Sequence, residues 1–408
     1  MAMRKAVLKN GMKLIYEKRD ASIASFCIAF DAGALREEDG FLFGTAHALE
    51  HMLYKGTKTR SEGDINRISD ELFGFSNAMT NYPYSIYYGT TLSSNFEKGL
   101  ELYSDILLNP VLKEDGFREE MNIISEELRE WADDPVQLCE DKLFRNCFRT
   151  RRIRERIIGS QETIGTLHMD ELRRFYRRYY IPQNCALAVV TPDSFEDTLD
   201  IIEKYFGDWE KGSELCLNIG FEDNKAGGFI EDAGNSEGAK IEYCFTAHGL
   251  TLQEEKALSV FSYHLGEGVT SILYDAIRTR RGLAYEVSSG LRKESGIKLL
   301  TVNVSTAREN VDRVRRIIDG IMVGIVNGEA YSPGHSQLQK AEDMLKIRRE
   351  LLLEKSVQLA KELSTYELMH GSCSGVCNEF DGIGALNPEF IKRTAAKVLR
   401  NRSVQILK

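Results

Sequence analysis

Apolar and polar residues alternate over residues 4–18, on both sides of the dipeptide Asn10-Gly11. This dipeptide favours a tight turn between antiparallel strands, so the stretch predicts a β-hairpin. Residues 23–30 form a mostly apolar run that is typical of a further strand. We therefore expect the chain to begin with β-structure.

Helical spacing follows after a loop that is rich in acidic residues and glycine. The sequence GTAHALEHMLYKGT predicts a helix that stops at Gly56, and residues 60–74 predict a second helix. Residues 76–92 (SNAMTNYPYSIYYGTTL) are aromatic and rich in β-formers, and residues 95–107 return to helical spacing. This order predicts a strand followed by a helix.

A similar unit recurs in the second half of the chain. Residues 296–304 predict a strand and residues 305–321 a helix, while the strand at 241–247 resembles the one at 25–30. We interpret this as a weak internal duplication, with the boundary in the polar, glycine-bearing stretch 211–234. The expected fold is α+β: two homologous α/β sandwich domains at 1–215 and 225–408, each a mostly antiparallel sheet packed with helices.

Length and composition agree with a two-domain soluble protein. The chain has 408 residues, of which 42% are hydrophobic and 28% charged, and a formal net charge of -9, which argues against a nucleic-acid partner. No apolar stretch has the length of a signal peptide core or a membrane span, so we expect a cytoplasmic protein with no membrane partner. Its eight scattered cysteines predict reduced, mostly buried thiols.

The first predicted helix carries a metal-binding pattern. His47 and His51 are four residues apart and Glu50 lies between them, so all three project from one helical face. Two imidazoles at this spacing can reach one zinc ion, and the carboxylate can act as general base for a zinc-bound water. The order H-x-x-E-H is that of inverted-motif zinc peptidases. The alternative is two surface histidines on a solvated helix.

A hydrolytic zinc site needs a third protein ligand, and the predicted helix 116–131 offers five glutamates. Its buried stripe is expected to consist of Phe117, Met121, Ile124, Leu128 and Trp131. Glu127 and Glu120 lie along the flank of this stripe, and the other glutamates face the polar side. Glu127 is thus a candidate ligand, and Glu120 a candidate for orienting a ligand histidine. On pattern alone, a solvated acidic helix is an equal alternative.

The segments HALEHMLYKGT, SNAMTNYPYSIYY and EEMNIISEEL together resemble the family of insulinase, pitrilysin and mitochondrial processing peptidase. The resemblance spans both halves. It implies a zinc site in which a glutamate 76 residues after the second histidine completes the ligand set, and this residue is Glu127. The upstream glutamate of the family pattern falls on Glu120.

Two further segments carry implied roles. Residues 75–80 resemble the strand on which the family binds an extended peptide, which implies roles for Asn77 and Ala78; otherwise the segment is a turn entering a strand. Residues 266–287 resemble the family's arginine and tyrosine region, which implies that Arg278 and Tyr285 bind the substrate carbonyl or stabilise an oxyanion. The alternative is an ordinary helical arginine and a packed tyrosine.

One segment departs from the family pattern. Residues 148–164 carry arginines where relatives usually have histidine, proline and glycine. A solvated face is the default interpretation, and a preference for acidic substrates is the alternative.

The expected function is zinc-dependent endopeptidase activity on unfolded or short peptides in an enclosed chamber, with one zinc ion per chain. Because both implied halves of the active site occur in this chain, a homodimer with complementing sites is the simplest assembly, and a heterodimer with a related subunit is the alternative. A non-catalytic scaffold or peptide-binding subunit, and a protease dedicated to peptide maturation in a biosynthetic pathway, are the competing functions.

Overall fold

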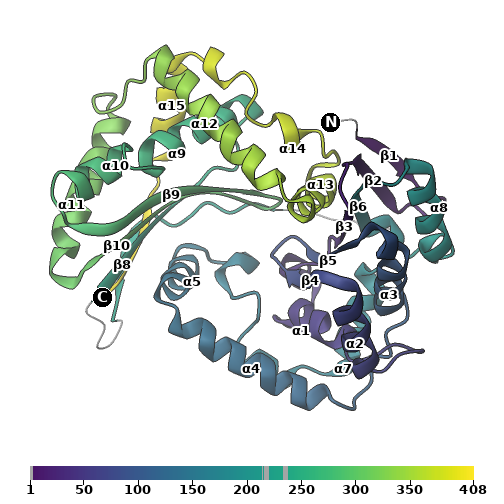
Figure 1. Ribbon diagram of the computed structural model, residues 1–408. Helices are drawn as coiled ribbons and strands as arrows, with labels where there is room; N and C mark the ends of the chain where they lie inside the picture. Colours follow the sequence, from purple (N-terminus) through teal and green to yellow (C-terminus); the bar gives the residue numbers. More distant parts are fainter. Residues whose placement is uncertain (1–2, 214, 216–219, 233–237) are drawn as a thin grey trace. The chain divides into compact units, whose positions relative to one another are not determined.

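The computed structural model describes residues 3–213, 215, 220–232 and 238–408, which form two compact units (Figure 1). The first unit comprises residues 1–128, 156–218 and 351–377, and the second comprises residues 129–155, 219–350 and 378–408. Each unit has one β-sheet with helices packed on it, which confirms the expected fold class.

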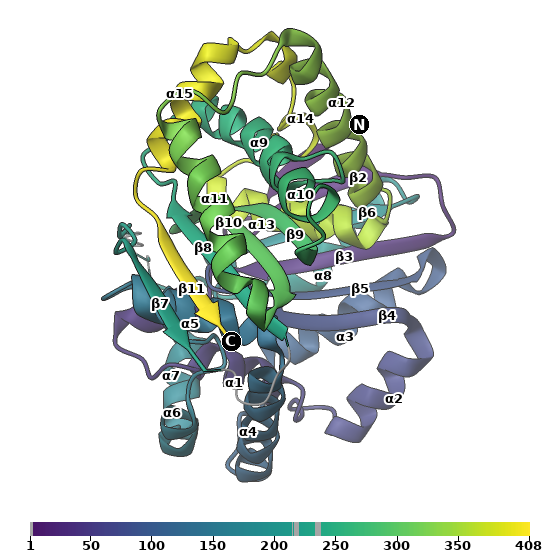
Figure 2. The same ribbon diagram turned by 90° about the vertical axis from the view of Figure 1, so that its left-hand side faces the viewer.

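The sheet of the first unit has the strand order β1-β2-β6-β3-β5-β4, and Figure 2 shows β2, β6, β3, β5 and β4 side by side. Its strands are β1 (Arg4–Val7), β2 (Lys13–Lys18), β3 (Ile23–Phe30), β4 (Phe73–Thr80), β5 (Ser85–Leu92) and β6 (Cys185–Thr191). Only the β2–β6 pair is parallel. The predicted hairpin is confirmed as β1–β2, and Gly11 adopts the positive φ of 93° that its turn requires.

Both faces of this sheet are covered, which explains why β3 and β6 are almost continuously apolar. On one face, Phe26, Ile28 and Phe30 of β3 enter the main core. The helices on this face that contribute to the core are α1 (Thr45–Leu53), α2 (Glu62–Leu72), α3 (Phe96–Leu108), α4 (Phe117–Asp133), α6 (Gln161–Thr166), α7 (Met169–Tyr179) and α8 (Phe195–Phe206).

The other face of the first sheet packs against α13 (Ser356–His370), a helix from the C-terminal half of the chain. Small side chains such as Cys27, Ala29, Ala186 and Ala188 point to this face. Because they are short, they allow the helix to lie close to the strands. The short helix α14 (Gly375–Asn378) follows.

The second sheet has the strand order β7-β11-β8-β10-β9. Its strands are β7 (Gly227–Glu231), β8 (Gly238–Thr246), β9 (Ala284–Glu294), β10 (Ile297–Ala307) and β11 (Ser403–Leu407), with only β7–β11 parallel. Strands β7, β11, β8, β10 and β9 correspond one by one to β2, β6, β3, β5 and β4 of the first sheet, both in their position in the sheet and in their order along the chain. The shared topology supports the internal duplication inferred from the sequence.

One face of the second sheet packs against helices of its own half. Figure 1 shows α9 (Leu252–Gly266), α10 (Ile272–Tyr274) and α11 (Val311–Val326) on this face, and α12 (His335–Leu353) and α15 (Pro388–Val398) add to the same core. The other face packs against α5 (Pro135–Cys147), which comes from the N-terminal half. Asn146 of α5 donates to Gln405 of β11 at 2.9 Å, so this contact is partly polar.

The two halves of the chain therefore exchange equivalent helices. Helix α5 precedes β6 in the first half but lies on the second sheet, and α13 precedes β11 in the second half but lies on the first sheet. The division consequently differs from a single boundary between residues 215 and 225. Of the predicted boundary stretch 211–234, residues 214, 216–219 and 233–234 lie outside the described part.

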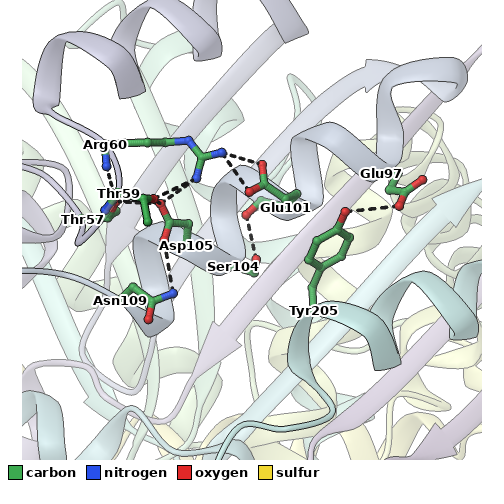
Figure 3. A network of polar contacts seen from close by, with 9 residues as sticks. All are labelled: Thr57, Thr59, Arg60, Glu97, Glu101, Ser104, Asp105, Asn109 and Tyr205. Carbon is green, nitrogen blue, oxygen red and sulfur yellow. Dashed lines mark hydrogen bonds and ion pairs between the residues drawn. The ribbon is translucent and has the colours of Figure 1, made fainter.

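A buried carboxylate fixes the turn between α1 and α2 (Figure 3). Asp105 of α3 accepts hydrogen bonds from Thr57 (2.6 Å), Thr59 (2.8 Å) and Arg60 (2.7 Å). One guanidinium nitrogen of Arg60 also donates to both carboxylate oxygens of Glu101, at 2.8 and 2.9 Å. Burial raises the pKa of Asp105, but these donors outweigh it and the pKa lies below its usual value.

We expect Asp105→Asn to lower the free energy of unfolding by about 1.5–3 kcal/mol, because hydrogen bonds to a buried charge are lost. Since the folded pKa is depressed, the contribution of Asp105 is present above the unfolded pKa and is lost as pH falls through the folded pKa. Urea unfolding at several pH values should show that the wild type loses its advantage over the variant on acidification. Glu97→Gln, at an exposed pair with Lys204, is the control and should change stability little.

The described ranges contain no helix that is both long and apolar enough to cross a membrane. Seven of the eight cysteines are described and six of them are buried, while Cys216 lies outside the described residues.

Candidate metal centre

Helix α1 presents its polar face through local packing and capping. Ala46, Leu49 and Leu53 are buried in the core of the first unit, so His47, Glu50 and His51 face away from it. The first turn of α1 has no acidic residue of its own. The buried carboxylate of Glu37 instead accepts from the backbone N–H groups of Gly44 (3.1 Å) and Ala46 (2.9 Å) and thereby caps the helix.

Three side chains of the first unit converge as candidate metal ligands. The Nε2 atoms of His47 and His51 lie 3.8 and 3.5 Å from Oε2 of Glu127 on α4, and the ligand atoms of all three lie within 4.8 Å of one another. Tetrahedral zinc ligands are separated by about 3.3–3.6 Å, so this donor set fits zinc. Within the described part of the chain, no second group of this kind occurs.

Burial suits His47 to bind a metal. It lowers the pKa of His47 to about 3, with a further contribution from His51, so the imidazole is neutral and its lone pair is available. The Nδ1 atom of His47 is buried without a hydrogen-bond partner. His47 thus has the protonation state that metal ligation requires. Burial lowers the pKa of His51, but the carboxylates around it, Glu120 first among them, outweigh burial and raise this pKa above its usual value.

Glu120 orients His51. Its Oε1 lies 2.8 Å from Nδ1 of His51, and its Oε2 is paired with Lys55 at 2.5 Å, while Lys55 also bonds Glu62 at 2.9 Å. Burial raises the pKa of Glu120, but these partners outweigh it and hold the pKa below its usual value. A carboxylate on the far nitrogen of a ligand histidine fixes the ring and makes it a better donor.

We expect Glu120→Gln to weaken zinc binding by about 10–100-fold, because the amide cannot hold His51 or balance Lys55 as the carboxylate does. Competition with a zinc-binding dye measures this change. Glu119→Gln, on the exposed side of the same helix, should leave the affinity unchanged. Equal affinities for the wild type and the Glu120 variant would contradict the orienting role.

Glu50 is held beside the ligands by β4. The hydroxyl of Thr80 donates to Oε2 of Glu50 at 2.5 Å. Burial raises the pKa of Glu50, although Thr80 and His51 oppose the shift. A raised pKa brings a carboxyl group closer to the pH at which it can both accept and release a proton.

A cavity of about 790 Å³ lies over this cluster within the first unit. Its walls come from α1, α2, α3, α4 and β4, and include Tyr54, Asp70, Ser76, Asn77 and Ala78. Strand β4 is the edge strand of the sheet, and Asn77 is exposed with its Oδ1 accepting from the N–H of Ala78 at 2.9 Å. An extended peptide could pair with this edge.

Arg278 and Tyr285 belong to the second unit, whereas the histidines and Glu127 belong to the first. Arg278 lies in a π-helical turn (Asp275–Thr279) and donates to the carbonyl of Tyr285 at 2.5 Å. Its guanidinium also stacks 5.0 Å from the ring centre of Tyr274. The Tyr285 side chain is exposed, so its hydroxyl is available to a ligand.

The arginine-rich segment 149–156 is tied into its surroundings. Arg152 is completely buried and donates to the carbonyl of Glu155 at 2.6 Å. The carboxylate of Glu222 accepts from the backbone N–H groups of Arg149, Thr150 and Arg151. Much of this segment therefore serves local structure.

Sequence patterns missed three residues that support the cluster: Glu37, Lys55 and Thr80. Lys55 lies four residues after His51, a spacing that could have placed it near the site. The contacts of Glu37 and Thr80 depend on folding beyond one helix, and no local pattern marks them.

Two family models match consecutive stretches of the chain. Residues 13–161 match the family model described as Insulinase (Peptidase family M16), and residues 166–329 match the model described as Peptidase M16 inactive domain. The candidate metal ligands fall in the first match, and Arg278 and Tyr285 fall in the second.

Curated relatives are similar over nearly their whole length. The chain is 25% identical to the uncharacterized zinc protease YmxG of Bacillus subtilis, over 97% of this chain and 95% of the relative. It is 26% identical to the uncharacterized zinc protease SCO5738 of Streptomyces coelicolor, over 98% and 88%.

Solved structures share the fold. A protease from Helicobacter pylori superposes with a TM-score of 0.88 at 20% identity and covers 100% of this chain and 99% of its own. A structure described as a peptidase M16 inactive domain from Pseudomonas fluorescens gives 0.87 at 18% identity, with 100% and 98% covered. At these identities the likeness concerns the fold.

Proposed function

Because the chain belongs to the insulinase family of peptidases (M16), we propose that it is a zinc-dependent endopeptidase that cleaves unfolded or short peptides. The observation that carries the proposal is the convergence of His47, His51 and Glu127, with Glu50 on the same helix face. This set combines three ligands, an adjacent base and a cavity, which is what a hydrolytic zinc site requires.

One zinc ion per chain, bound by these three ligands, would polarise the scissile carbonyl and lower the pKa of water. Glu50 accepts a proton from the attacking water and passes it to the leaving amine nitrogen. Thr80 keeps the Glu50 carboxylate in place through its hydroxyl. Glu120 holds the ring of His51 in the orientation that ligation needs.

Strand β4 would bind the substrate by pairing with it as an additional strand. The free edge of β4 beside the cavity supports this arrangement, and Asn77 and Ala78 lie at that edge. Binding through the backbone selects extended peptides, because a folded protein does not offer a free strand. The protein would thus cleave unfolded or short peptides within an enclosed chamber in the cytoplasm.

Arg278 and Tyr285 would complete the site of another subunit in a homodimer, binding the substrate carbonyl oxygen or the oxyanion through their N–H and O–H groups. The presence of both parts in one chain supports the proposal. An equal mixture of Arg278→Ala and His47→Ala proteins should recover about a quarter of the wild-type activity, since half of the dimers are mixed and each keeps one complete site. No recovery in the mixture would contradict complementation.

Metal analysis combined with peptide hydrolysis tests the function. The purified protein should contain one zinc ion per chain, lose cleavage of an unstructured peptide library on chelation, and regain it on addition of zinc. A protein that binds no metal would overturn the proposal. Bound zinc without any cleavage would favour the non-catalytic alternative, and cleavage of a single sequence would favour dedicated peptide maturation.

A further inference from the structure

A second cavity, of about 570 Å³, lies on the α13 face of the first sheet. It is found where β3 and β4 begin and where α13 begins, and its apolar lining includes Ile23, Phe75, Val190 and Val357. Phe75 is 50% exposed although it is a large aromatic residue. An exposed apolar surface of this kind beside a binding strand indicates a contact site.

Hydrogen bonds hold the α13 side of this cavity in place. The guanidinium of Arg19 donates to the carbonyls of Glu354 (2.6 Å) and Leu353 (3.1 Å). The hydroxyl of Ser356, the first residue of α13, lies 2.7 Å from that of Ser25 on β3. The cavity is therefore built from several fixed elements.

Strand β4 connects this cavity with the candidate metal centre. Its side chains alternate between the two faces of the sheet: Ser76 and Ala78 line the metal cavity and Thr80 contacts Glu50, whereas Phe75 packs on Tyr88 of the α13 face. A peptide that pairs with β4 would follow the same pleat. Its side chains would then point alternately to the metal cavity and to the α13 face.

The register along β4 sets the spacing between the two cavities. The metal centre lies level with Ala78–Thr80, and the apolar cavity lies level with Gly74–Phe75. This separation corresponds to about four residues of an extended strand, or roughly 13 Å. Antiparallel pairing, the more stable kind, makes the peptide run from the Thr80 end towards the Phe73 end. The apolar cavity is then reached on the C-terminal side of the cleaved bond.

We propose that this cavity is a specificity subsite that takes a large apolar side chain of the substrate, about four residues C-terminal to the cleaved bond. The proposal rests on the peptidase function proposed above. It means that substrates are also selected by one side chain that binds on the face of the sheet opposite the metal, away from the reacting atoms.

A peptide library with a fixed cleavage site and one varied position downstream tests the proposal. We compare peptides that differ only at the position about four residues after the cleaved bond. The kcat/KM of the wild type should be about 10–100-fold higher when this residue is leucine or phenylalanine than when it is aspartate. The preference should peak at one position. A flat profile over the third to fifth positions would overturn the subsite.

Val357→Asp provides the matching variant. Val357 is the second residue of α13, where a carboxylate suits the helix N-terminus, so the variant should fold. We expect it to lose the apolar preference and to favour lysine at the same position, while cleaving peptides with alanine there as the wild type does. Val323→Asp on α11 of the second unit, at an exposed valine outside this cavity, should keep the wild-type profile.

The two proposals fail differently. If the zinc-loaded wild type cleaves no peptide at all, the proposed function fails. If it cleaves the library but Val357→Asp and the wild type share one profile, only the subsite fails.

Discussion

Replacing Glu50 with glutamine should reduce kcat/KM for peptide hydrolysis by about 10²–10⁴-fold, while the protein still binds zinc. Glutamine has nearly the same shape and can still accept from Thr80, so the helix and the metal ligands keep their positions. It cannot accept the proton of the attacking water. The experiment consists of steady-state hydrolysis together with metal analysis of the same preparation.

The combination of retained zinc and lost activity separates a base from a ligand. Glu71→Gln, at an exposed residue of α2 that pairs with Arg67, is a control of the same chemistry and should retain full activity. A Glu50 variant that cleaves as fast as the wild type would exclude Glu50 as the general base. Loss of zinc together with activity would instead assign Glu50 a role in holding the metal.

Glu127→Gln should have the opposite signature, namely weaker zinc binding by more than about 100-fold and an activity that excess zinc partly restores. The change removes the one anionic ligand of the candidate set, and the two histidines alone form an incomplete site. Zinc affinity measured by chelator competition, followed by activity as a function of added zinc, tests this expectation.

Glu126→Gln is the adjacent control. Its side chain points to the exposed side of α4, so zinc binding should be unchanged. If Glu127→Gln binds zinc as tightly as the wild type, the third ligand is another residue. The two variants of neighbouring glutamates thus test the assignment on one helix.

Local periodicity predicted much of the fold because the elements are amphipathic in a regular way. The stripe of Phe117, Met121, Ile124 and Leu128 is buried in α4, and this places Glu120 and Glu127 along the helix edge nearest to the histidines. For the same reason the choice among five glutamates agreed with the geometry. Trp131, expected in the same stripe, is only half-buried.

Contacts between distant segments were beyond this kind of reasoning. The sequence pattern of residues 76–92 predicted a single β-rich stretch, whereas the structure has two strands, β4 and β5, that form a hairpin. Strand β4 already begins at Phe73. The bond between Thr80 and Glu50 joins a strand to a helix 30 residues away, and Arg19 reaches Leu353 across 334 residues. No spacing within one element encodes such pairs.

The exchange of α5 and α13 has a consequence for synthesis on the ribosome. The first sheet receives its last strand at Thr191, but the small side chains of Cys27, Ala29 and Ala188 remain uncovered until α13 is made, which ends at residue 370 of 408. The half that is translated first therefore completes its core only after strands β7–β10 of the second sheet and helix α13 have been made. A nascent chain of this protein must keep an apolar sheet face protected until then, and chain termination before α13 would leave that face open to aggregation.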